Sequence, residues 1–125
     1  MPETLSEAER DQHLPALAAT GWRAATGRDA IRKIWKFRSF GEAWGFMSRA
    51  ALAAEKLNHH PEWFNAYNVV DVTLTTHECH GLSMLDLDLA RRMDAVAGDT
   101  AVEHDHSAPL ECLCQIGAQA GAAAT

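Results

Sequence analysis

The pattern of apolar and polar residues predicts a first helix followed by a β-hairpin. Ser6-Glu7-Ala8-Glu9 has the form of a capping box, in which a serine hydroxyl and a glutamate bond the free N–H groups at a helix start. The helix is expected to end near Thr20-Gly21. Two extended arms, residues 22–25 and 30–37, follow it and flank a turn.

The next helix is predicted between Ser39-Phe40-Gly41-Glu42, a second capping box, and Leu57-Asn58. Its apolar residues form two lines. The first recurs at steps of four and three residues, is expected to lie on the core, and contains Phe40, Trp44, Met47, Ala51 and Ala54. The second runs beside it and contains Phe46, Ala50, Ala53 and Leu57. So wide an apolar arc predicts contact with more than one neighbour.

Two further strands are predicted after this helix. They are Trp63–Tyr67 and Val69–Thr76, separated at Asn68. Apolar and polar residues alternate through residues 70–75, as they do in a strand with one buried face. Continuing the alternation places His77 on the polar face of the strand.

A third helix, from Ser83 to Gly98, completes the order α-β-β-α-β-β-α. This order predicts an α+β fold, in which three helices pack on one face of a four-stranded antiparallel sheet. A chain of 125 residues suits one domain, which we assign to residues 1–98. Residues 99–125 are polar and then rich in Ala and Gly, and we expect a mobile extension because they hold few large apolar side chains.

Charge and composition exclude several classes of protein. The net charge of −6, with basic residues scattered along the chain, disfavours non-specific nucleic-acid binding. No apolar run approaches the roughly 20 residues of a membrane span, and the acidic start does not resemble a signal peptide. Three cysteines, an odd number, give no disulfide framework. We therefore expect a cytoplasmic protein, with a nuclear location left open.

The candidate chemistry is concentrated in residues 55–86, which hold four of the seven histidines. His59-His60-Pro61 follows the second helix, and His77 follows the last strand. Histidine can both donate and accept a proton near neutral pH, so three near one pocket suggest acid–base chemistry. Trp63 offers a flat apolar surface of the kind that stacks on a planar heterocycle.

Each of these residues also has a simpler structural interpretation. The His-His pair can cap the last carbonyls of the helix and complement its dipole. Trp63 can belong to the core, and Glu55 can be a solvated helix residue. Asp86 lies three residues after Ser83 and fits the acidic member of a capping box. Cys79 fits a small buried hydrophobe.

A zinc site is the sharper alternative, because several side chains of this stretch are of types that bind zinc. They are His59, His60, His77, Glu78, Cys79 and His80. The histidines of His77-Glu78-Cys79-His80 are three residues apart, whereas the helical zinc motif needs four, and the segment follows a strand. The runs Cys112-Leu113-Cys114 and His104-Asp105-His106 lie in the predicted extension. Zinc is therefore disfavoured.

Two segments carry a resemblance to a known family. Residues 55–68 (EKLNHHPEWFNAYN) and 76–83 (THECHGLS), followed by Asp86, resemble the pterin-4a-carbinolamine dehydratases. The animal members are also known as the dimerisation cofactor of a homeodomain transcription factor. The resemblance extends from about Leu5 to Val96 and leaves out only the extension.

The resemblance implies a hydro-lyase that converts 4a-hydroxytetrahydropterin to quinonoid dihydropterin and water, as in tetrahydrobiopterin recycling after aromatic amino-acid hydroxylation. His59 and His77 match the positions of general acid–base residues, one for each face of the pterin. His60 matches the histidine that positions the pterin.

The resemblance also implies a substrate-binding set, which comprises Glu55, Pro61, Trp63 and Asp86. Trp63 would form a wall of the pocket, while Glu55 and Asp86 would orient histidines or bind polar edges of the ring. No metal or organic cofactor is implied. Members of the family have the same order of elements and form homo-dimers or homo-tetramers.

The sequence departs from the family at two positions. Leu85 stands where a basic residue often precedes the active-site aspartate, and Val69 stands where a lysine is common. We therefore expect contacts to the polar edges or side chain of the pterin to differ.

Three functions are compatible with these observations. The leading one is the dehydratase. The second is a protein-binding module, a transcriptional coactivator or dimerisation cofactor, that docks through the face of its second predicted helix. The third is a metallohydrolase, which would need stoichiometric zinc. Nothing in the sequence identifies a transcription-factor partner.

Overall fold

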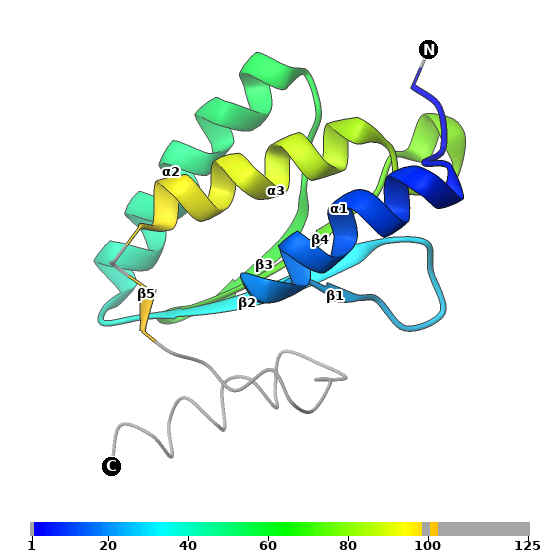
Figure 1. Ribbon diagram of the computed structural model, residues 1–125. Helices are drawn as coiled ribbons and strands as arrows, with labels where there is room; N and C mark the ends of the chain where they lie inside the picture. The colour runs from blue at the N-terminus through cyan, green and yellow to red at the C-terminus, as the bar shows by residue number, and fades with distance from the viewer. Residues whose placement is uncertain (1, 99–100, 103–125) are drawn as a thin grey trace.

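The computed structural model describes residues 2–98 and 101–102, and its elements follow the predicted order. Its helices are α1 (Glu7–Ala19), α2 (Phe40–Leu57) and α3 (Met84–Ala97), with one turn of 3-10 helix, η1 (His77–Cys79), before α3. Its strands are β1 (Arg23–Ala24), β2 (Ile31–Phe37), β3 (Glu62–Ala66), β4 (Val69–Leu74) and β5 (Ala101–Val102). The α-helices cover one face of the sheet (Figure 1), so the predicted α+β fold is confirmed.

The sheet has the strand order β1-β2-β4-β3, and each neighbouring pair is antiparallel. Trp35 of β2 lies opposite Val70, and Trp63 of β3 lies opposite Val72. β5 also pairs with β2, placing Val102 opposite Lys36. This fifth strand was not predicted, because two residues are too few to show an alternation.

The predicted domain boundary coincides with the end of α3, where Gly98 forms the cap with a positive φ of 51°. Of the predicted extension only Ala101–Val102 is described, in β5. The other residues of 99–125, including the Cys112 and His104 runs, lie outside the described residues, so the extension and its mobility stay predictions. Within the described part of the chain, no helix combines the length and apolarity of a membrane span.

The helix starts follow the predicted caps with one difference. Complete capping boxes are present at Ser6 and Ser83. At the start of α2, the Ser39 hydroxyl accepts from the Glu42 N–H as expected, but the Glu42 carboxylate accepts from the N–H of Arg38. The predicted second capping box is therefore only half formed.

The face that α2 buries differs from the prediction. Phe40 and Trp44, which the sequence analysis placed on the core, are 49% and 57% exposed. The buried residues of the helix are Ala43, Phe46, Ala50 and Ala54. The helix is therefore rotated so that Phe46 and three alanines face the core. The two large aromatic rings are left at the surface.

The core lies between the sheet and the three helices. The Phe46 ring lies 4.7 Å from that of Trp35 and 5.1 Å from that of Phe37, so aromatic side chains from α2 and β2 form its centre. The strand β4 and the helix α3 complete it with Val70, Val72, Leu74, Leu87, Leu89 and Met93.

The end of β4 corrects the predicted placement of His77. The strand stops at Leu74, and His77 begins η1 instead of continuing the alternation. Thr76 between them is fully buried, and its backbone exchanges two hydrogen bonds with Gly81, of 2.9 and 3.2 Å. The chain therefore turns away from the sheet before His77.

Candidate active site

His59 is placed by the end of α2. Asn58 adopts the left-handed conformation that commonly terminates helices, with φ of 50°, and the His59 N–H donates to the Ala54 carbonyl over 3.1 Å. The backbone N–H of His59 thus caps α2, as the structural interpretation expected. Its imidazole ring turns inward and is only 6% exposed.

Asp86 meets this imidazole from the first turn of α3. His59 Nε2 lies 2.6 Å from Asp86 Oδ1, and the carboxylate is fully buried. An ionised carboxylate only accepts hydrogen bonds, so a charged Asp86 pairs with the imidazole proton on Nε2. The His59 side chain is therefore held in one orientation by a buried acid.

Asp86 performs the predicted capping role at the same time. Its Oδ2 accepts from the Ser83 N–H over 3.0 Å and from the Thr76 hydroxyl over 2.7 Å. The helix cap and the histidine partner are thus one carboxylate, which uses a different oxygen for each role.

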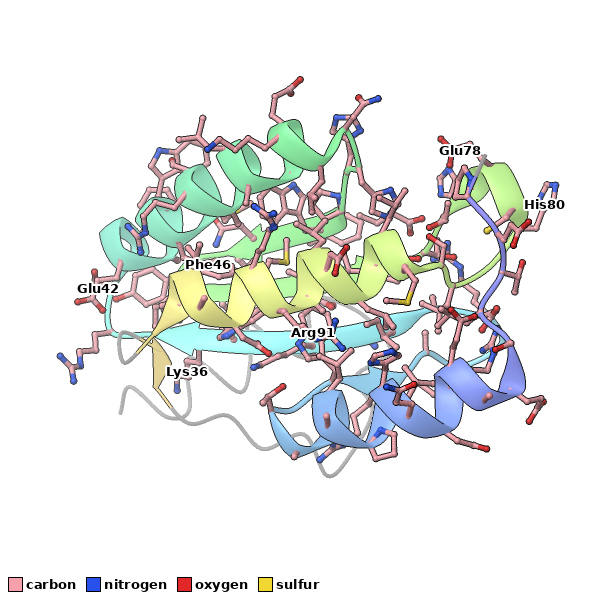
Figure 2. The ribbon with its side chains drawn as sticks, turned by 45° about the horizontal axis from the view of Figure 1, so that its top comes forward. Lys36, Glu42, Phe46, Glu78, His80 and Arg91 are labelled. Carbon is pink, nitrogen blue, oxygen red and sulfur yellow. The ribbon has the colours of Figure 1, made fainter. Side chains whose placement is uncertain are left out.

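His77 lies in a much more open setting. Its side chain is 75% exposed, and its Nε2 lies 2.9 Å from Oε2 of Glu62 at the start of β3. Glu62 is three residues after His59, so this contact brings His77 to the His59-His60-Pro61 segment. Figure 2 shows Glu78 and His80 on the outer side of the same turn.

Glu62 is also paired with Arg28. The two guanidinium nitrogens of Arg28 lie 2.7 and 2.8 Å from the carboxylate oxygens. Together with the weaker contribution of His77, this pair lowers the pKa of Glu62 to about 2, because both donors favour the charged carboxylate. The Glu62 carboxylate is therefore negatively charged in the folded protein at neutral pH.

The other predicted site residues are close in sequence to His59 and Glu62. His60 is exposed beside His59, and Pro61 is half-buried at the start of β3. Trp63 is half-buried and packs against the core, as the structural interpretation of this residue expected. It also directly follows Glu62 in the sequence. Glu55 is exposed on the last turn of α2, and no hydrogen bond joins its carboxylate to another described side chain.

The departures from the family pattern lie in different settings. Val69 is buried at the start of β4, with 1% of its surface exposed, and Leu85 is half-buried in the first turn of α3. Cys79 is a half-buried free thiol with its Sγ 3.5 Å from the Gly81 carbonyl. Among residues 2–98 and 101–102, no three His, Cys, Asp or Glu side chains gather as a metal site.

No role in the site was predicted from the sequence for Thr76, Glu62 or Arg28. Thr76 could have been noticed as a polar residue directly after an alternating strand. Glu62 follows the His-His-Pro run, but its partner Arg28 comes from the turn between β1 and β2, and no local signal links the two.

Comparison with known proteins agrees with the resemblance. A model of the pterin 4 alpha carbinolamine dehydratase family matches residues 3–96. Proteins of Brucella ovis and Brucella canis, each provisionally named pterin-4-alpha-carbinolamine dehydratase, are 55% identical over 94 residues, which cover 75% of this chain and 95% of each relative.

Two solved structures share the fold. A transcriptional coactivator/pterin dehydratase from Brucella melitensis is 54% identical, with a TM-score of 0.72 over 77% of this chain and 100% of that chain. A pterin dehydratase-like protein, identified as a RuBisCO assembly factor in the alpha-carboxysome, is 25% identical, with a TM-score of 0.55 over 62% and 90% of the two chains. The family model and the relatives of more than 50% identity show that this chain belongs to the pterin-4a-carbinolamine dehydratase family.

Proposed function

We propose that the protein removes water from a 4a-hydroxytetrahydropterin, with His59 and His77 as the acid–base residues. In this reaction the C4a–O bond breaks, and the oxygen takes up a proton and leaves as water. N5 loses its proton, and the electron pair of the N5–H bond forms the C4a=N5 double bond. One proton is delivered and one is removed, so the reaction needs a general acid and a general base and no oxidant.

The pairing of His59 with Asp86 carries this proposal. A buried carboxylate that binds Nε2 orients the imidazole and stabilises the imidazolium that forms when Nδ1 takes up a proton. Among the described residues, Asn68 Oδ1 is the one buried side-chain nitrogen or oxygen without a partner. Nδ1 of His59 also makes no hydrogen bond but is not one of these buried atoms. It is therefore partly exposed, and a ligand can reach it.

His77 supplies the second proton-transferring group in this proposal. It comes from η1, on a different element from His59, and Glu62 binds its Nε2. Each histidine is thus held through Nε2 by a carboxylate and keeps Nδ1 available. We assign one histidine to each face of the pterin ring.

The remaining predicted residues would bind the substrate. His60 and Pro61 stand in the sequence between His59 and Glu62, and Glu62 is the hydrogen-bond partner of His77. The half-buried Trp63 offers an apolar ring surface for the planar pterin. Glu55 is exposed and stands four residues before His59 in the sequence. It would bind a polar edge of the ligand.

We further propose that the protein serves tetrahydrobiopterin recycling in the cytoplasm. The quinonoid dihydropterin product is a substrate for reduction, so a pterin reductase would consume it. The proposed location rests on the odd number of cysteines and the free thiol of Cys79.

A second role, in self-association, is supported by α2. Phe40 and Trp44 lie one turn apart on the helix, are exposed, and form a row with stacked rings 6.4 Å apart. Such a row of large apolar side chains is typical of an interaction surface. We propose that it joins copies of this chain in a homo-oligomer, and that a partner protein would use the same row if a coactivator role exists.

The dehydratase proposal is tested by following the ultraviolet absorbance of a 4a-hydroxytetrahydropterin as it loses water. Purified protein should accelerate this loss over the buffer rate, and His59→Gln should remove most of the acceleration. A rate equal to that of buffer alone would refute the activity. The control is His13→Gln, because His13 lies on α1 and contacts Arg91.

A further inference from the structure

A chain of hydrogen bonds leads from the start of α3 to His59. The backbone N–H of Leu85 donates to Ser83 Oγ over 3.3 Å, and Ser83 Oγ lies 2.6 Å from Thr76 Oγ1. Thr76 Oγ1 in turn donates to Asp86 Oδ2 over 2.7 Å, and Asp86 Oδ1 binds His59. All four side chains of this chain, those of Ser83, Thr76, Asp86 and His59, are buried.

The direction of each hydrogen bond in this chain is determined by its ends. The ionised Asp86 has no proton to donate, so the single hydroxyl proton of Thr76 points to it. Thr76 must therefore accept from the Ser83 hydroxyl, and Ser83 accepts from the Leu85 N–H. Every donor points toward Asp86, so the carboxylate is held with Oδ1 directed at His59.

Within this chain of hydrogen bonds, Thr76 contacts Asp86 only through its side-chain hydroxyl. Ser83 contributes a backbone N–H to Asp86 Oδ2 that would survive a change of its side chain. The Thr76 hydroxyl has no such substitute, and its backbone is fixed by the two hydrogen bonds to Gly81. Removing the hydroxyl leaves the Ser83 N–H as the remaining donor to Asp86 Oδ2, so the carboxylate is held less firmly.

We propose that Thr76 is a positioning residue of the dehydratase: its hydroxyl orients Asp86, which keeps the His59 proton on Nε2 and leaves Nδ1 to exchange a proton with the pterin. The inference rests on the proposed function for its catalytic part. Its structural part, the location of the imidazole proton, is independent of any activity.

The first test reads the tautomer directly. In wild-type protein labelled with 15N, the His59 nitrogens are assigned by NMR without substrate, at a pH above about 8 where histidine is neutral. We expect the proton on Nε2, and a proton on Nδ1 would overturn the inference. This result holds whether or not the protein proves to be a dehydratase.

The second test compares three variants in the pterin assay. Thr76→Val keeps the shape and removes the hydroxyl, and it should lower kcat about tenfold while KM changes less than about twofold. Thr76→Ser keeps a hydroxyl and should restore kcat. The control is Thr75→Val, because the neighbouring Thr75 hydroxyl donates to the Asp29 carbonyl and not to the chain that reaches His59.

The outcomes separate the inference from the function on which it rests. A kcat for Thr76→Val equal to that of wild type, or a loss that Thr76→Ser does not restore, would overturn the positioning role. Should Thr76→Val fail to fold, or the wild type show no dehydratase activity, the tautomer decides: Nε2–H supports the arrangement and Nδ1–H refutes it.

Discussion

Asp86 Oδ1 lies 2.6 Å from His59 Nε2, although the two residues are 27 positions apart in the sequence. The contact joins the end of α2 to the start of α3 and is fully buried on the Asp86 side. Because the same carboxylate also caps α3, the orientation of the candidate catalytic histidine is built into the packing of two helices.

Asp86→Asn should separate the capping role from the electrostatic one. An asparagine amide can still occupy the cap, but its NH₂ group can donate to His59 Nε2 and drive the ring proton to Nδ1. We expect kcat to fall by about 10²–10⁴, as for a catalytic histidine held in the wrong tautomer. Steady-state kinetics with a circular dichroism spectrum would check this. An unchanged kcat in a folded variant would contradict the role of the pair.

The Glu62 pair should make stability depend on acid pH. Its pKa falls from 4.5 to about 2 in the folded protein, so the stabilisation is fully present above pH 4.5 and is lost as the pH falls through 2. Glu62→Gln should flatten this part of the curve of unfolding free energy against pH. The pair is partly exposed, so the effect should be less than about 1 kcal/mol.

Urea unfolding of wild type and variants across this pH range measures the difference. Glu55→Gln is the matched control, because Glu55 is exposed and makes no hydrogen bond with another described side chain. Parallel curves for Glu62→Gln and wild type would show that the carboxylate titrates alike in the folded and unfolded chains.

The orientation of α2 predicts losses of stability of very different size for two phenylalanines of one helix. Phe46 is fully buried against Trp35 and Phe37, so Phe46→Ala should destabilise the protein by about 3–5 kcal/mol. Phe40 is 49% exposed, and Phe40→Ala should cost less than about 1 kcal/mol in the monomer. Chemical denaturation checks both values. Equal losses would mean that α2 buries a different face.

The exposed row on α2 should control self-association. Trp44→Glu places a charge among these apolar side chains and should shift the protein toward monomer, as measured by sedimentation velocity. Ala95→Glu adds the same charge at an exposed position of α3 and should leave the assembly unchanged. Met47 is a poorer site for this test, because it packs partly against the core. An unaltered oligomer in Trp44→Glu would rule out this surface.

Local patterns predicted the elements of the fold but not all of their contacts. The serine caps and the period-2 alternation gave the helix starts and strands, because these signals depend on a few neighbouring residues. The predicted buried face of α2 was wrong at Phe40 and Trp44, since both apolar lines satisfied helical spacing and only packing against the sheet distinguishes them. The bulky Phe40 and Trp44 favoured the wrong line, whereas the alanines Ala43 and Ala50 are the residues that fit.

The candidate site was predicted in part for the same reason. The histidines stood out by their chemistry, and Asp86 by its spacing from Ser83. The bonds from Thr76 to Asp86 and from Arg28 to Glu62 join separate elements, and their partners follow only from the strand register and the turn after β4. His77 was placed on the strand because nothing local marks the end of β4 at Leu74.

The most direct test of the account is the dehydration rate of a 4a-hydroxytetrahydropterin with wild type, the double variant His59→Ala/His77→Ala and the control His13→Gln. We predict that wild type and control accelerate the loss of water equally, and that the double variant, folded by circular dichroism, falls to the rate of buffer alone. A double variant as fast as wild type would contradict acid–base catalysis by these two histidines.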